Sequence, residues 1–146
     1  MEKVLILAGS KSDDEIAKQA CDVLGAFGVP YRYEVASAHR NPDKVERLVR
    51  ESTAQVFIGI AGLSAALPGV IASRTAKPVI GVPVGGGSLN GMDALFSISQ
   101  MPPNVPVACV GVGMGKNAGL LAVQILALND PALAIKLNDF KEKLKQ

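Results

Sequence analysis

The sequence predicts an α/β fold in which five parallel strands form one sheet with helices on both faces. Short apolar runs alternate with helical patterns along all 146 residues, as they do in doubly wound sheets. Hydrophobic residues make up 49% of the chain and aromatic residues only 4%. The core must therefore consist of Ala, Val, Ile and Leu, which suit helices packed on a parallel sheet. This length fits a single domain over residues 1–146.

Five short runs of residues are expected to form the strands. The first, Val4 to Ala8, is continuous and stops at Gly9, as expected for a strand buried on both faces. The other runs cover residues 31–35, 55–60, 78–82 and 105–110. Because crossovers between parallel strands are right-handed, few strand orders are possible. We expect the order 2-1-3-4-5 of a flavodoxin-like three-layer α/β/α fold, completed by a C-terminal helix.

Helical patterns occupy the intervals between these runs. Ser12 or Asp13 is expected to cap the first helix, which ends near Gly28, and Asn41-Pro42-Asp43 opens the second. The helix over 116–128 is apolar almost all round, so we expect it to be buried on most sides, partly by a neighbouring subunit. The remaining helices are expected over residues 66–74, 92–99 and 132–145.

The composition excludes several classes of function. A net charge of +2, no block of Lys or Arg and few aromatic residues argue against nucleic-acid binding. No uncharged apolar stretch reaches the roughly 20 residues that span a membrane, and no signal peptide precedes the first strand. We therefore expect a cytoplasmic protein without a membrane partner. Cys21 and Cys109 lack metal-ligand spacing and are expected to be buried, reduced thiols. A mean hydropathy of +0.29 predicts apolar surface in subunit interfaces.

The segment after the first strand is a candidate phosphate site, because ligands of open parallel sheets bind beyond the carboxyl ends of the strands. Gly9 lets the backbone turn, and the helix start that follows offers free N–H groups and a positive dipole end. The hydroxyls of Ser10 and Ser12 can add hydrogen bonds, and Asp13 can accept from ribose hydroxyls. The segment lacks the spacing of a P-loop, and it also fits a plain strand–turn–helix with a capping side chain.

The segment Ser37-Ala38-His39-Arg40 follows the second strand. His39 is the only histidine of the chain, and imidazole can accept or donate a proton near physiological pH. Arg40 offers a fork of donors that suits a phosphate. A His beside an Arg can also be ordinary surface, but the end of a parallel strand is where a ligand is expected.

Small residues follow the third and fourth strands. Gly62 and its neighbours allow a substrate to come close to the backbone, and Ser64 is the one polar side chain there. The glycine-rich segment 85–91 can fold over a ligand or be an ordinary loop. Taken alone, the pattern of each loop is a weak indication of a ligand site. The loop after the third strand is also explained by a tight entry into the next helix. All four loops fall at the same predicted edge of the sheet, and that coincidence favours a ligand site.

Together these loops resemble the aminoimidazole ribonucleotide carboxylase/mutase family of purine biosynthesis. The resemblance covers nearly the whole chain, and so many ordered matches make it specific. The matching segments are 9–13, 37–43, 61–69, 78–84, 89–93, 97–102 and 117–122.

The resemblance implies a flavodoxin-like subunit in a homo-octamer, with sites at subunit contacts and with no metal and no organic cofactor. The implied substrate is a small ribonucleotide, whose carboxylate moves from the exocyclic N5 to ring carbon C4 by way of CO2. In this reaction His39 is the proton shuttle. The residues implied to bind the substrate are Ser10, Asp13 and Arg40, with Gly9, Ser12, Ser37, Gly62 and Ser64 as weaker candidates.

The third loop departs from the pattern of the mutases. They usually carry a second His before Leu-Pro-Gly, where this chain has Ala66. The pair Leu63-Ser64 resembles the direct carboxylases, which use free CO2, whereas Arg40 and the segments 91–93 and 100–102 favour the mutases. We therefore expect an N5-to-C4 mutase, with direct carboxylation as the alternative. A decarboxylating relative and a non-catalytic nucleotide-binding module on the same fold are further readings.

Overall fold

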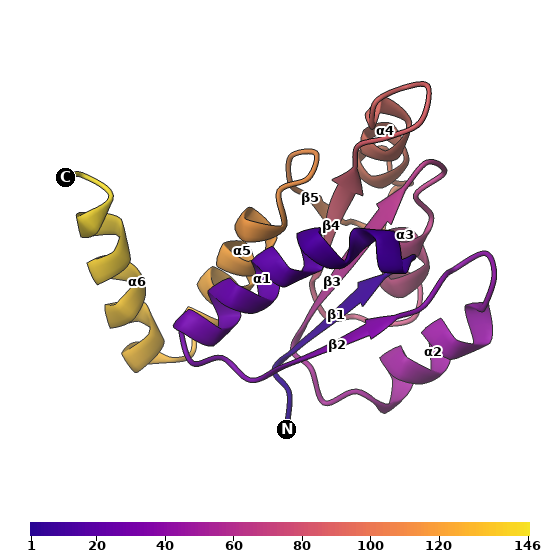
Figure 1. Ribbon diagram of the computed structural model, residues 1–146. Helices are drawn as coiled ribbons and strands as arrows, with labels where there is room; N and C mark the ends of the chain where they lie inside the picture. Colours follow the sequence, from indigo (N-terminus) through magenta and orange to yellow (C-terminus); the bar gives the residue numbers. More distant parts are fainter.

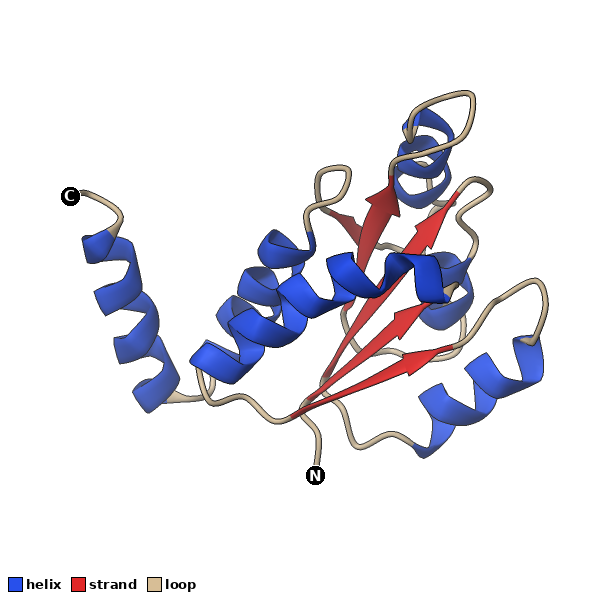
Figure 2. Cartoon of the chain, viewed as in Figure 1, coloured by secondary structure: helices blue, strands red, loops and turns tan.

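The computed structural model describes residues 1–146 and contains one five-stranded parallel sheet. The strand order is β2-β1-β3-β4-β5, which confirms the flavodoxin-like prediction. The strand arrows point to the same side of the molecule in Figure 2, so their carboxyl ends share one edge. The strands are β1 (Val4–Ala8), β2 (Tyr31–Val35), β3 (Val56–Gly62), β4 (Val79–Val84) and β5 (Ala108–Cys109).

Helices cover both faces of this sheet (Figure 1). One buried cluster joins α1 and α5 to one face, and the other joins α2, α3 and α4 to the opposite face. Strands β1, β3 and β4 lie between the two clusters and are almost fully buried, as their apolar runs predict. The helices are α1 (Asp14–Ala26), α2 (Pro42–Glu51), α3 (Leu67–Ala72), α4 (Met92–Ser99), α5 (Gly115–Ala127) and α6 (Pro131–Lys143), with the 3₁₀ turn η1 (Lys11–Asp13) before α1.

Strand β5 is much shorter than the predicted run of residues 105–110. It keeps two residues, which pair with Ile80 and Gly81 of β4. The physical reason is Pro106, which lacks the N–H that a ladder needs and restricts the residue before it. The sheet therefore has a short edge on this side, and the rest of the predicted strand is outside regular secondary structure.

The start of the first helix also differs from the prediction. Asp13 occupies the N-cap position of α1, as predicted, but its side chain makes no capping bond. The capping bond is made one turn earlier by Ser10, whose Oγ accepts a hydrogen bond from the Ser12 N–H at 3.3 Å. The cap serves the 3₁₀ turn η1, which precedes α1 and was not expected. Because the Asp13 carboxylate makes no capping bond, it is available to face the carboxyl edge of the sheet.

The two thiols are free, as predicted, but neither is fully buried. Cys21 on α1 and Cys109 on β5 are both half-buried. Burial raises the pKa of each thiol, so neither is an activated nucleophile.

Helix α6 lies beyond α5 and extends from the side of the molecule (Figure 1). Leu133 and Leu137 attach it to the buried cluster, and the Phe140 ring meets Phe27 edge-on with 5.6 Å between ring centroids. Ile135, which lies between these two leucines in sequence, is exposed. No helix in the structure is long and apolar enough to cross a membrane.

Candidate active site

A cleft of about 600 Å³ lies at the carboxyl edge of the sheet. The loops after β1, β2, β3 and β4 all contribute to it, as expected for a doubly wound sheet. The structure brings all nine sequence-predicted site residues to this cleft. They are Gly9, Ser10, Ser12, Asp13, Ser37, His39, Arg40, Gly62 and Ser64.

The turn after β1 forms the first wall of the cleft. The Ser12 hydroxyl donates to Ser10 Oγ at 3.0 Å, so the two predicted hydroxyls form one hydrogen-bonded pair. Gly9 N–H donates to the Ile60 carbonyl of β3 at 3.0 Å, which fixes the turn against the next strand. This wall therefore offers hydroxyls and the start of a helix, groups that suit an oxyanion.

Asp13 is the only polar or charged residue of the chain that is fully buried. Its exposed fraction is 6%, although it lines the cleft. Burial raises the pKa of the Asp13 carboxyl, and the positive charge of Arg40 acts in the opposite direction. A carboxylate beside a cleft can accept charge-assisted hydrogen bonds from the hydroxyl groups of a ligand.

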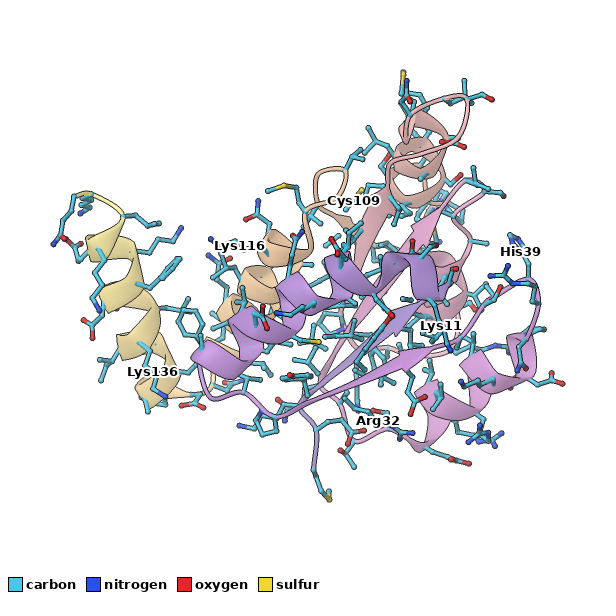
Figure 3. The ribbon with its side chains drawn as sticks, viewed as in Figure 1. Lys11, Arg32, His39, Cys109, Lys116 and Lys136 are labelled. Carbon is cyan, nitrogen blue, oxygen red and sulfur yellow. The ribbon has the colours of Figure 1, made fainter.

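The loop between β2 and α2 carries His39. Its turn is closed by the Asn41 N–H, which donates to the Ser37 carbonyl at 2.9 Å, and by the Arg40 N–H, which donates to Ser37 Oγ at 3.2 Å. The imidazole of His39 is exposed and has no hydrogen-bond partner within the chain, and Figure 3 shows it at the outer end of the loop. Ser37 therefore shapes this turn, and the imidazole is free to meet a ligand.

Arg40 connects the first two loops. Its Nη2 donates to the carbonyl oxygen of Gly9 at 2.8 Å, and its side chain remains exposed at the cleft. One guanidinium nitrogen therefore holds the backbone of the β1 turn. The remaining N–H donors of the Arg40 guanidinium are available for an anion near Ser10.

The loops after β3 and β4 form the opposite wall. Leu63 adopts a left-handed backbone conformation with φ of 53°, and its side chain is 61% exposed. It lies against the glycine-rich loop, where a Cβ on Gly87 would approach Leu63 Cδ2 to 2.9 Å. Sequence reasoning missed Leu63, because no local pattern predicts a leucine with positive φ.

Other lining residues were also not predicted individually. The sequence left open whether the glycine-rich loop folds over a ligand or is an ordinary loop, and Gly85, Gly86 and Gly87 of it line the cleft. Ala66, the residue before α3, and Leu67, the first residue of that helix, also line the cleft. The remaining unpredicted lining residues are Ala38, Ala61 and Val84.

The cleft thus combines one imidazole, one guanidinium, one buried carboxyl and small-residue backbone. This set can bind a phosphorylated, hydroxylated molecule and move a proton on it. The chain brings together no group of three or more His, Cys, Asp or Glu that could hold a metal ion.

Comparisons with known proteins identify relatives over nearly the whole chain. A family model described as AIR carboxylase matches residues 3–146. The N5-carboxyaminoimidazole ribonucleotide mutase of Methanocaldococcus jannaschii is 54% identical over 98% of this chain and 90% of its own length. The mutase of that name from Bacillus subtilis is 50% identical over 97% and 90%. The crystal structure of Treponema denticola PurE matches with a TM-score of 0.89 and 31% identity, over 98% of this chain and 91% of that one.

Proposed function

The chain belongs to the AIR carboxylase family, and we propose that it converts N5-carboxyaminoimidazole ribonucleotide to 4-carboxy-5-aminoimidazole ribonucleotide with His39 as the proton carrier. Its relatives at 54% and 50% identity are N5-carboxyaminoimidazole ribonucleotide mutases, and it shares their role as an isomerase of purine biosynthesis. The observation that carries the assignment of residues is that His39 lines the same cleft as Ser10, Asp13 and Arg40, groups that suit a ribose phosphate.

The reaction needs two proton movements. The bond between N5 and the carboxylate carbon breaks, CO2 forms, and the amine nitrogen takes up a proton. The nucleophilic ring carbon C4 then attacks CO2, and the new C4 centre loses its proton. One imidazole can perform both steps if it gives a proton to the amine and takes one from C4.

His39 suits this role because its imidazole is not engaged elsewhere. It has no hydrogen-bond partner in the chain, and it is the only histidine. A residue that both donates and accepts must be free to change its protonation state, and a structural hydrogen bond would hold one state. The opposite wall, formed by Leu63 and Gly87, is well placed to confine the transient CO2.

The ribose and phosphate parts of the substrate are assigned to the loops that follow β1 and β2. We assign the ribose hydroxyls to the buried carboxylate of Asp13, and the phosphate to Ser10 and Arg40. Gly9, Ser12, Ser37, Gly62 and Ser64 have supporting roles at the walls. The proposed assembly is a cytoplasmic homo-octamer, which accounts for the high mean hydropathy and for the exposed apolar side chains of α4 and α6.

A second candidate function is direct carboxylation of aminoimidazole ribonucleotide with CO2. Ala66 favours it, because this methyl group lines the cleft at the place where the mutases carry a second imidazole. Purified protein is given either the N5-carboxy nucleotide or the uncarboxylated nucleotide with bicarbonate, and the C4-carboxylated product is measured at short times. We expect product from the N5-carboxy substrate; an equal rate from bicarbonate would assign the chain to direct carboxylation.

The His39→Asn variant tests the proton carrier and separates an enzyme from a nucleotide-binding module. We expect turnover to fall by at least about 10²-fold, the usual loss for a general acid/base, while nucleotide binding measured by calorimetry persists. His39 is exposed, so the variant should melt like the parent protein. Equal turnover in variant and parent would show that His39 carries no proton, and no turnover in the parent would favour the binding module.

A further inference from the structure

The strand that leads to His39 is the open edge of the sheet. Strand β2 pairs only with β1, and the Ala36 N–H donates to the Ala8 carbonyl of that strand at 2.8 Å. The Val35 carbonyl and the Ala36 N–H belong to one trans peptide group, in which the C=O and N–H bonds point in opposite directions. The carbonyl of Val35 therefore points away from the sheet, where no further strand is present to donate to it.

Lys44 of α2 supplies the missing donor. Its Nζ donates to the Val35 carbonyl at 2.6 Å and lies 3.7 Å from Glu34 Oε2. Glu34 also accepts from Arg32, with Arg32 Nη2 at 2.8 Å from Glu34 Oε1. That hydrogen bond from Arg32, with Lys44 contributing, holds the pKa of Glu34 below its usual value, so the carboxylate stays charged beside both cations.

The helix that carries Lys44 is firmly fixed. Val45, Leu48 and Val49 of α2 are buried against the sheet. Asn41 caps the helix, because its Oδ1 accepts from the backbone N–H of Lys44 at 3.2 Å. Lys44 thus ties the last residue of β2 to the first turn of α2, and the loop between these two points contains His39.

We propose that Lys44 is a positioning residue that fixes the loop of His39 by clamping the two ends of that loop together. The proposal rests on the proposed role of His39 as proton carrier. Lys44 touches neither the cleft nor any group assigned to the substrate, so it acts only through the backbone. Proton transfer depends on small distances, and a shift of about 1 Å in a catalytic group can lower the rate about 10²-fold.

The chain offers a matched control on the same helix. Arg47 also carries one positive charge on α2, but it lies 4.0 Å from its partner Glu51, and both side chains are more than half exposed. An exposed ion pair of this kind contributes little to the stability of the fold. Arg47→Met therefore removes the same charge from the same helix without opening the clamp.

Three variants test the proposal through kinetics. We expect Lys44→Met to lower kcat by roughly 10-fold to 10²-fold with KM changed less than about twofold, since the substrate groups stay in place. Lys44→Arg, which can still donate to the carbonyl, should recover most of the loss, and Arg47→Met should match the parent. A kcat for Lys44→Met equal to that of the parent would overturn the proposal.

A double-mutant comparison separates this proposal from the one on which it rests. If Lys44 acts through His39, Lys44→Met costs no further activity in the His39→Asn background. An equal loss in both backgrounds would refute positioning of His39. Should His39→Asn alone turn over like the parent, the proposed role of His39 fails, and the next measurement still decides the clamp.

That measurement is the NMR signal of the imidazole. His39 is the only histidine, so its ring C–H resonances are unambiguous in the folded protein. We expect them to shift and broaden in Lys44→Met and to stay unchanged in Arg47→Met. Unchanged ring signals in Lys44→Met would mean that the clamp does not position His39, whatever the variant does to stability.

Discussion

Two hollows of nearly equal size lie on opposite sides of the molecule. The cleft at the carboxyl edge measures about 600 Å³, and a groove between α1, α5 and α6 measures about 660 Å³. Figure 3 shows His39 on the cleft side, and Lys116 and Lys136 on the groove side. Volume alone therefore does not distinguish a candidate active site from a gap between helices.

The difference lies in the groups that face each hollow. The cleft is lined by loops whose turns, glycines and helix start leave backbone and side-chain donors free. The groove is lined by the sides of helices, whose backbone groups are paired within each helix. Its apolar floor includes Phe27 and Phe140, and Lys136 already donates to the Phe27 carbonyl at 3.3 Å. We infer that the helical side serves stability and the loop side serves chemistry.

Gly115→Ala should give the largest effect on the helical side. A Cβ at Gly115 would lie 2.1 Å from the Ile16 carbonyl oxygen, so α1 and α5 must separate. We expect the free energy of unfolding to fall by about 3 kcal/mol or more in urea titrations, the upper end for overpacking. Turnover per folded molecule should stay near that of the parent.

The control for this variant is Gly25→Ala, also in a helix of the same layer. A Cβ there meets no atom within 4 Å, so alanine should raise stability by roughly 0.5–1 kcal/mol. Equal stability of Gly115→Ala and the parent would show that the contact between α1 and α5 is not tight.

Asp13→Asn sharpens the comparison on the loop side, because it should improve stability while it impairs function. Burial raises the pKa of Asp13 above its unfolded value, so ionisation costs stability as the pH rises through about 3.9. We expect the variant to have a higher Tm than the parent at pH 7. Below about pH 3.9, where the parent carboxyl is protonated in both states, we expect no difference in Tm. The KM for the ribonucleotide should rise about tenfold, because a charged acceptor is lost.

Asp22→Asn is a suitable control, since Asp22 lines the groove and forms an exposed pair with Lys18. Because an exposed ion pair contributes little to stability, Asp22→Asn should melt like the parent at pH 7. A lower Tm for Asp13→Asn at pH 7 would show that the carboxylate stabilises the fold.

Lys143→Met should give the smallest effect. Lys143 lines the groove near the end of α6 and forms no ion pair. Surface substitutions of this kind change the free energy of unfolding by no more than about 0.5 kcal/mol. Because Lys143 does not line the cleft, turnover should also remain within about twofold of that of the parent. A tenfold loss of turnover would place the groove within the active site and would end the distinction between the two hollows.

The elements with strong periodic patterns were predictable from the sequence. Val4–Ala8 and Tyr31–Val35 have the predicted bounds, because turn residues specify them locally: Gly9 follows the first strand, and Gly28 and Pro30 precede the second. The fifth strand was overestimated because Pro106 limits pairing with β4, a tertiary effect. The edge that gathers the site residues was predictable from the parallel topology.

Finer features of the site could not be predicted. The positive φ of Leu63 and the burial of Asp13 depend on loops far away in sequence, such as the one containing Gly87. The bond from Lys44 to the Val35 carbonyl requires that β2 be known as an edge strand. Local patterns place residues on an edge, but they do not determine which side chain completes a neighbour's hydrogen bond.

The lysine that reaches Val35 has a consequence for solubility as well. An open sheet edge is a template on which strands of other molecules can add, leading to aggregation. Charged side chains of Arg32, Glu34 and Lys44 flank this edge, and the ammonium group occupies an acceptor that an incoming strand would use. At the opposite edge, β5 is too short to recruit a partner. Both margins of the sheet are thereby protected against intermolecular strand addition.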